Sequence, residues 1–140
     1  MNLNVRFANQ NDLEAAMEFD LHRNEKVVSN KIEMKEVIVA ESEGEIVGCL
    51  KLEYLWTHMP FISYIVVKDG LRHGGIGASL LGFLENYLRD EKEAEFLLSS
   101  SMTDATKAQK WHMRRGFKEC GFISGINEEG VGEVFFRKDL

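Results

Sequence analysis

Four glycines fall within eight positions near the middle of the chain, at Gly70, Gly74, Gly75 and Gly77. Residues 61–67 before them are rich in β-branched and aromatic side chains, which predicts a strand. Apolar residues recur after them at helical spacing, which predicts a helix that begins near Ile76. A strand that enters a helix through glycines leaves unpaired backbone amides aimed at one spot, and the absent Cβ atoms let a ligand come close. This turn is therefore suited to bind a pyrophosphate group.

The spacing of the glycines excludes two common nucleotide-binding motifs. The chain has no Gly-x-x-x-x-Gly-Lys-Ser/Thr segment, which excludes a P-loop. Gly75 and Gly77 could start a dinucleotide-binding fingerprint, but Leu80 stands where that motif requires Gly or Ala. Two alternatives stay open at this point: a turn that binds no ligand, and a nucleotide site for a different cofactor.

Two segments carry a resemblance to a known family. The turn Arg72-His73-Gly74-Gly75-Ile76-Gly77 fits the pattern Arg/Gln-x-x-Gly-x-Gly/Ala and resembles motif A of the GNAT superfamily of acetyl-CoA-dependent N-acetyltransferases. Downstream, Ala108-Gln-Lys-Trp111-His112-Met-Arg-Arg-Gly116-Phe117 is similar to the family's Ala-x-x-Phe-Tyr-x-x-x-Gly-Phe segment. The opening residues 5–8, followed by Asp12, also resemble the family's first strand and helix, so the resemblance covers nearly the whole chain.

The resemblance implies acetyl-CoA as the cofactor, with CoA as the product. Its pyrophosphate would bind the turn and the first helical residues, namely Arg72, His73, Gly74, Gly75, Ile76, Gly77, Ala78 and Ser79. Its pantetheine arm would pair with the strand backbone at Ile65, Val66 and Val67, where that strand parts from residues 96–99. Ala108 and Trp111 of the downstream segment would complete the cofactor site.

The reaction implied is direct attack of a neutral amine on the thioester, with the CoA thiolate leaving and no acyl-enzyme. A backbone amide of the strand 61–67 would polarise the thioester oxygen. The acceptor would be a small-molecule or peptide amine. Because acidic side chains outnumber basic ones in residues 1–70, a cationic acceptor is favoured.

The chain departs from the family pattern at two positions. Ala105 stands where the family often has Asn, and His112 stands where it has the Tyr that protonates the leaving thiolate. We expect His112 to act as a neutral hydrogen-bond donor to that thiolate, and a packing role is the alternative. The departures also motivate a second hypothesis, in which the protein is a catalytically weakened CoA-binding module.

The general base is less defined by the sequence. Glu53 is the candidate carboxylate, because aromatic residues around it could form a pocket for a cationic amine. These neighbours are Tyr54, Trp56, His58, Phe61 and Tyr64. The alternative is a solvated Glu53 with aromatics that belong to the core or to the surface of a homodimer.

Composition sets the outer limits of these predictions. The 140 residues predict one domain, 1–140, and 44% apolar with 29% charged residues is an ordinary globular balance. A net charge of −6 argues against a nucleic-acid partner. The longest stretch free of Asp, Glu, Lys and Arg, 54–67, is shorter than the roughly 20 residues of a membrane helix, and no signal peptide is expected.

The cysteine and histidine patterns complete the exclusions. Cys49 and Cys120 lie outside any CxxC, which predicts reduced core cysteines in a cytoplasmic protein. The scattered histidines form no ligand motif, so no metal is expected.

Sequence periodicity predicts an α+β (mixed α/β) fold. Strands are expected at 3–8, 37–40, 45–55, 61–67, 96–99, 117–123 and 133–137, with Pro60 in a loop. Helices are expected from an Asn9 or Asn11 cap to about Arg23, within 24–35, from Ile76 to 89–93, and from a Thr103 or Asp104 cap to Arg115. The GNAT resemblance implies a central, mostly antiparallel sheet with a splayed parallel pair and helices on both faces.

Overall fold

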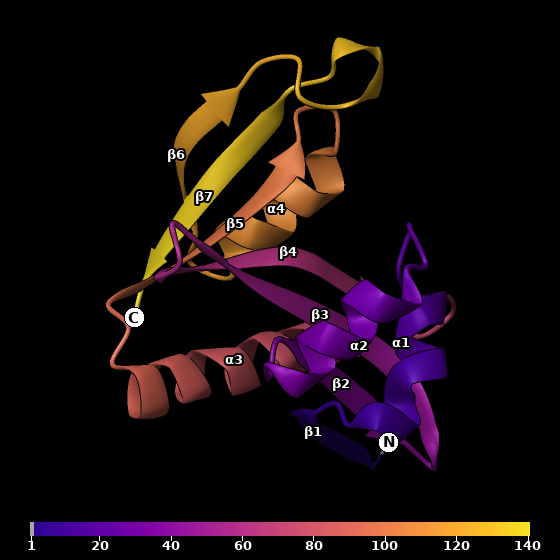
Figure 1. The fold of residues 1–140 in the computed structure, drawn as a ribbon. Helices are drawn as coiled ribbons and strands as arrows, with labels where there is room; N and C mark the ends of the chain where they lie inside the picture. The colour runs from indigo at the N-terminus through magenta and orange to yellow at the C-terminus, as the bar shows by residue number, and fades with distance from the viewer. Residues whose placement is uncertain (1) are drawn as a thin grey trace.

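A single seven-stranded sheet, in the order β1-β2-β3-β4-β5-β7-β6, runs through the computed structural model, which describes residues 2–140 (Figure 1). The strands are β1 (Leu3–Phe7), β2 (Val37–Ser42), β3 (Glu45–Leu55), β4 (Met59–Val67), β5 (Phe96–Met102), β6 (Lys118–Ile123) and β7 (Glu133–Asp139). All neighbours pair antiparallel except β4 and β5, which are parallel. This sheet confirms the predicted fold class.

Helices cover both faces of the sheet. They are α1 (Leu13–Glu18), α2 (Glu25–Glu33), α3 (Ile76–Lys92) and α4 (Thr106–Arg114). Alternate residues of β2 point to opposite faces of the sheet. Val37 and Val39 pack with α1 and α2, whereas Ile38 and Ala40 pack with α3. We call these the α1/α2 face and the α3/α4 face. Within residues 2–140, no helix combines the length and the apolar character needed to cross a membrane.

The parallel pair β4–β5 is short and then opens. Its register contains only Phe61 opposite Leu98 and Ile62 opposite Ser99. In the pairing of β4 with β3, the register shifts after Ile62, so that Ser63 is an extra residue. Such a bulge bends a strand and increases its twist. Beyond this point, residues 63–67 of β4 have a strand neighbour only on the β3 side within the described chain, and we call the place where β4 and β5 part the branch point.

Several predicted elements agree with the structure. The strand 45–55 has the predicted limits, and the expected second helix is α2. Asn9 and Asp12 form a reciprocal capping box, which starts the 3-10 turn η1 (Gln10–Asp12) rather than α1 directly. The first helix is much shorter than predicted, and Leu21 beyond it is 86% exposed. Just after the end of α1, the buried carboxylate of Asp20 pairs with Lys51 at 2.6 Å and ties the chain to the sheet.

Three further expectations were wrong at the level of single residues. Pro60 lies in β4 opposite Tyr54, near the strand's start, where a missing N–H is tolerated. Helix α4 begins at Thr106 and is capped by neither Thr103 nor Asp104. Cys49 is buried as predicted, but Cys120 is exposed because β6 is the edge strand of the sheet.

Candidate functional site

The glycine-rich turn between β4 and α3 presents free backbone amides. Gly75, with a φ of 83°, precedes α3 in the left-handed region, and His73, with a φ of 71°, shares that conformation. The first helical hydrogen bond runs from the Ser79 amide to the Gly75 carbonyl, so the amides of residues 76–78 lie ahead of the helical ladder. A Cβ built on Gly75 would meet no atom within 4 Å. The turn is therefore open to a ligand at the positive end of a 17-residue helix.

Gly77, which the motif assigns to the cofactor site, also lies at the contact between α3 and α4. A Cβ on Gly77 would lie 3.6 Å from the Trp111 ring, so its small size allows α3 and α4 to pack closely. Trp111 itself is half-buried against the core of the α3/α4 face. Ala78 is half-buried in the first turn of α3, whereas Ser79 is exposed. Of the two glycines, only Gly75 opens toward solvent.

The strand segment predicted to hold the pantetheine arm lies beside the opened parallel pair. Ile65, Val66 and Val67 pair with β3 and have no β5 partner among the described residues. On β5, beyond the branch point, the Ser101 hydroxyl is buried and has no hydrogen-bond partner within residues 2–140. A buried hydroxyl without a partner is costly. Together with the free strand edge, it fits an amide-bearing chain bound between β4 and β5.

Arg72 and His73 are exposed on the turn. The Arg72 guanidinium pairs with Asp69 at 2.8 Å, and both side chains face solvent. Arg72 also lines a cavity of about 480 Å³ between α1 and β4, which Phe19, Tyr64 and Val66 help to form. This cavity places the turn beside the α1/α2 face as well as at the start of α3.

His112 is buried in the core of the α3/α4 face, with 3% of its surface exposed. Its Nδ1 lies 2.7 Å from the Ala108 carbonyl, which can only accept, so Nδ1 carries the proton. Nε2 lies 2.7 Å from the Ser99 hydroxyl and therefore accepts its hydrogen bond. The ring stacks on Phe136 at 4.7 Å, and burial lowers the pKa of His112, which keeps it neutral. Since both nitrogens are occupied, this geometry favours the packing alternative over donation to a thiolate.

Glu53 lies on the α1/α2 face, opposite Phe61 in the β3–β4 pairing. Its side chain is 52% exposed and 3.8 Å from the Lys31 ammonium of α2. The aromatic residues near it in sequence do not form one pocket: Tyr54 packs on the core of the α3/α4 face, whereas Tyr64 lies 5.1 Å from the Lys51 ammonium. Burial raises the pKa of both tyrosines to about 12, so their phenols stay protonated near neutral pH.

A polar cluster that the sequence did not indicate stands at the branch point. Ser100, the first β5 residue beyond the β4–β5 pairing, donates a hydrogen bond of 2.6 Å to the Glu133 carboxylate on β7. The Asn127 side-chain amide donates to the other oxygen at 2.9 Å. Phe61 and Phe135 stack beside this cluster with ring centres 5.7 Å apart. No local spacing could reveal it, because β5 and β7 meet only in the sheet.

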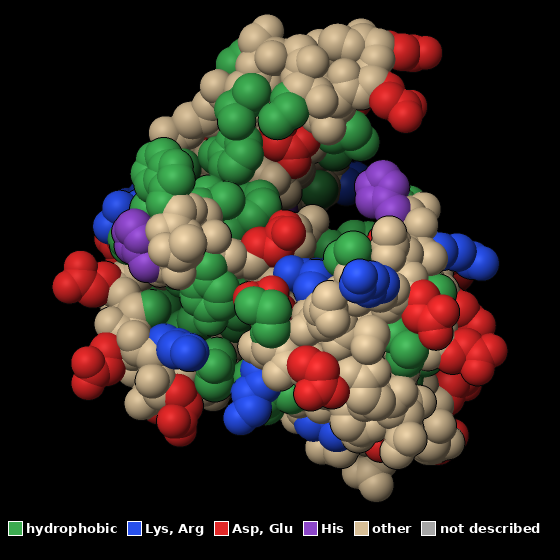
Figure 2. All heavy atoms as spheres, in the orientation of Figure 1, with side chains coloured by type: hydrophobic (Ala, Val, Ile, Leu, Met, Phe, Trp, Pro, Cys, Tyr) green, Lys and Arg blue, Asp and Glu red, His purple; other side chains and the backbone are tan. Residues whose placement is uncertain are grey.

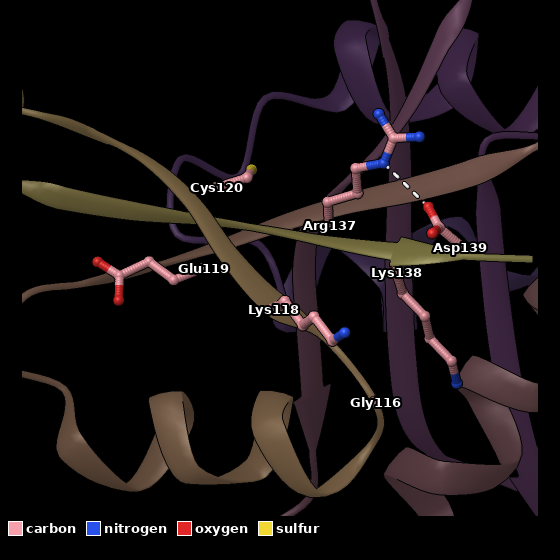
Figure 3. A pocket seen from close by; sticks show the side chains of 7 residues that line it. All are labelled: Gly116, Lys118, Glu119, Cys120, Arg137, Lys138 and Asp139. Atoms are coloured by element: carbon pink, nitrogen blue, oxygen red, sulfur yellow. Dashed lines mark hydrogen bonds and ion pairs between the residues drawn. The ribbon is translucent and has the colours of Figure 1, made fainter.

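A second cavity, of about 430 Å³, opens between β6 and β7 (Figure 3). Its lining residues are Gly116, Lys118, Glu119, Cys120, Arg137, Lys138 and Asp139. Arg137 pairs there with Asp139 at 3.0 Å (Figure 3). None of the residues predicted for the cofactor or for catalysis lines this cavity, so the candidate site is the branch point together with the glycine-rich turn.

Comparison with known proteins agrees with this geometry. The model of the Acetyltransferase (GNAT) family matches residues 7–117. An uncharacterized N-acetyltransferase of Methanocaldococcus jannaschii is 27% identical over 100 residues, which are 71% of this chain and 64% of the relative. The chain therefore matches less than two thirds of that relative's length.

Solved structures show the same fold over almost the entire chain. The ribosomal-protein-alanine N-acetyltransferase of Brucella melitensis has a TM-score of 0.83 at 24% identity, with 98% of this chain and 99% of that chain covered. Ard1 of Thermoplasma volcanium has a TM-score of 0.87 at 14% identity, over 99% and 97% of the two chains. A GNAT family acetyltransferase of Elizabethkingia anophelis with acetyl-CoA bound has a TM-score of 0.75 at 17% identity, over 99% of each chain. With the family model matching most of its length, the chain belongs to the GNAT acetyltransferase family.

Proposed function

We propose that the protein is an acetyl-CoA-dependent N-acetyltransferase that transfers the acetyl group directly to an amine of a small-molecule or peptide acceptor. The observation that carries the proposal is the junction of two features: an open amide-bearing turn at the start of α3 and a strand edge freed where β4 leaves β5. Acetyl-CoA has the two corresponding parts, a pyrophosphate and an amide-containing arm, and it supplies the activated thioester.

The chain's own groups have separate tasks in this proposal. The amides of residues 76–78 and the helix dipole bind the pyrophosphate, and Arg72 adds positive charge nearby. The backbone at 65–67 and the partnerless Ser101 hydroxyl hold the arm from opposite sides of the gap. An amide of β4 polarises the thioester oxygen at the branch point. Holding amine and thioester together lowers the entropic cost of the reaction.

His112 has a positioning role in this scheme. Through Ser99 it fastens α4 to β5 at the residue where the β4–β5 pairing ends. A thiolate is a good leaving group, so its departure does not require a strong acid from the protein. His112 therefore shapes the gap and transfers no proton.

A second candidate function is a CoA-binding module without transferase activity. It is favoured by Ala105 in place of the family's Asn and by the occupied ring nitrogens of His112. It shares the cofactor site but lacks the chemical step, so a single experiment separates the two functions.

The test has two measurements on one protein sample. Thermal unfolding with acetyl-CoA, CoA, ATP or NAD should show stabilisation by the first two only, because a ligand that binds only the folded state raises its stability. CoA thiol release should then be measured against a panel of amines. Stabilisation without release would support the binding module, and no stabilisation at millimolar acetyl-CoA would reject both functions.

A further inference from the structure

The branch point has a carboxylate on one of its two sides. Ile62 and Ser99 form the last parallel pair of β4 and β5, and Ser100 follows on the face opposite Ser99. Ser100 holds Glu133 by a 2.6 Å hydrogen bond on the α1/α2 face. A thioester bound in the gap at the branch point would therefore have the Ser99–His112 pair on one side and the Glu133 carboxylate on the other.

The Glu133 carboxylate is held in place by two hydrogen bonds, but part of its hydrogen-bonding capacity is free. Ser100 donates to one carboxylate oxygen and Asn127 donates to the other, so neither hydrogen bond is to a cation. An ionised carboxylate offers about four lone-pair positions, and these two donors leave others free. No Lys or Arg within the described residues forms an ion pair with Glu133, whereas Lys31 lies near Glu53. Its negative charge is therefore available to a ligand.

An aromatic pair borders the same carboxylate. Phe135 stands two residues from Glu133 on the same face of β7, and it stacks on Phe61 of β4. Both rings are half-buried, so part of each remains accessible. Figure 2, which looks onto the α1/α2 face, shows acidic side chains among hydrophobic ones between helices α1 and α2 and the part of the molecule that contains β5, β6 and β7. A carboxylate beside accessible aromatic faces attracts an alkylammonium group through charge and through the ring faces.

We propose that Glu133 is the catalytic residue that binds the acceptor: its carboxylate receives a primary alkylammonium group at the branch point, next to Phe61 and Phe135, and removes one proton from it. This inference rests on the proposed function. The neutral nitrogen then attacks the thioester carbon, a C–N bond forms and the C–S bond breaks. The thiolate takes the second N–H proton, directly or through water, and Glu133 returns its proton to solvent.

The experiment compares the wild-type protein with Glu133→Gln, which keeps the side-chain shape and an oxygen for the Ser100 hydroxyl. The matched control is Glu129→Gln, which removes an exposed carboxylate from the nearby turn η2 (Glu128–Gly130) and changes the net charge equally. CoA release is measured at saturating acetyl-CoA with spermidine, n-butylamine or a tripeptide with an N-terminal alanine. We expect kcat/KM for the best acceptor to fall about 100-fold in Glu133→Gln, with acetyl-CoA binding unchanged and the control close to wild type.

The pH profile distinguishes a proton acceptor from a purely structural residue. Without the carboxylate, only amine that is already neutral in solution can react. With n-butylamine as the acceptor, the kcat/KM of Glu133→Gln should then rise about tenfold per pH unit between pH 7 and pH 9, since an alkylamine has a pKa near 10. The wild-type protein should show a shallower rise, and Glu133→Asp should recover part of the activity at neutral pH.

Each outcome decides the proposal. If Glu133→Gln keeps kcat/KM within threefold of wild type with the same pH profile, Glu133 is not the acceptor residue although acetyl transfer stands. If the wild-type protein releases no CoA with these three amines or with the wider amine panel, the proposed transfer fails, and calorimetric titration of spermidine in millimolar CoA decides the amine site. Binding that weakens at least tenfold in Glu133→Gln supports the site, whereas equal or absent binding overturns it.

Discussion

Two consecutive serines of β5 lie on opposite faces of the sheet and in opposite kinds of surroundings. Ser99 is buried and donates a hydrogen bond to His112 Nε2, and the His112 Nδ1–H donates one to the Ala108 carbonyl. Ser100 is half-buried and donates to Glu133, which retains free lone pairs next to accessible rings. The first chain of hydrogen bonds is closed and can only hold elements together. The second leaves acceptor positions free on Glu133, which is why we propose that a ligand binds there.

The largest effect is expected at the turn that serves both faces. Gly75→Val should abolish stabilisation by acetyl-CoA. A β-branched residue is strained at a φ of 83°, and its methyl groups would occupy the open space in front of the free amides of the glycine-rich turn. Thermal unfolding with and without acetyl-CoA measures this. The matched control is Gly77→Ala, whose Cβ would make an ordinary 3.6 Å contact with Trp111 and should leave binding intact. If both variants lose stabilisation by acetyl-CoA equally, the cofactor site is not centred on Gly75.

His112→Phe tests whether the Ser99–His112 side is closed. The substitution leaves the Ser99 hydroxyl and the Ala108 carbonyl without their buried partner, which should cost about 2 kcal/mol of stability. For a chain of this size that corresponds to a fall in Tm on the order of 5–10 °C. Turnover per folded molecule, measured below the transition, should stay within threefold of wild type. A 100-fold loss of turnover in a stable variant would restore His112 as a proton donor.

The same side should give the protein a pH-dependent stability. Burial lowers the pKa of His112, so the unfolded chain takes up a proton at higher pH than the folded one. The free energy of unfolding should therefore be highest above pH 6.5 and fall as the pH drops below it, by at most about 1.4 kcal/mol per pH unit. Urea unfolding at pH 7.5 and pH 5.5 measures the fall. His112→Phe should show a smaller fall in the free energy of unfolding between these two pH values. If its fall equals that of the wild type, groups other than His112 cause the pH dependence.

The smallest effect is expected at Ser100, on the open side. Ser100→Ala removes one of the two donors that hold Glu133 while leaving the Asn127 contact. We expect kcat/KM to fall about threefold to tenfold, with little change in Tm, because Ser100 is only half-buried. Steady-state kinetics and a melting curve on the same sample check both. If Ser100→Ala lowers Tm strongly and leaves kcat/KM unchanged, Ser100 has a purely structural role like Ser99, and the two faces do not differ in the way described.

The local parts of the site could be predicted from the sequence. The turn with free backbone amides is formed by contiguous residues, so the run from Arg72 to Gly77 was sufficient to indicate its shape. The order of strands and helices followed from hydrophobic periods of two and of about 3.6, which depend on neighbours along the chain. The length of the first helix could not be read in this way, because the buried Asp20–Lys51 pair that ties down the chain after it joins residues 31 apart.

The tertiary structure alone decided which polar groups are free. His112 looked like a donor in its motif, but its nitrogens were assigned by Ser99 and Ala108 when α4 docked on β5. Glu133 carried no signal in sequence and gained its place because β7 pairs with β5, which brings it to a serine 33 residues earlier. Backbone amides point where local dihedral angles aim them, whereas a side chain's partners are set by sheet register and helix docking. For that reason the sequence determined the glycine-rich turn and the family resemblance, and only the fold separated the closed side of the branch point from the open one.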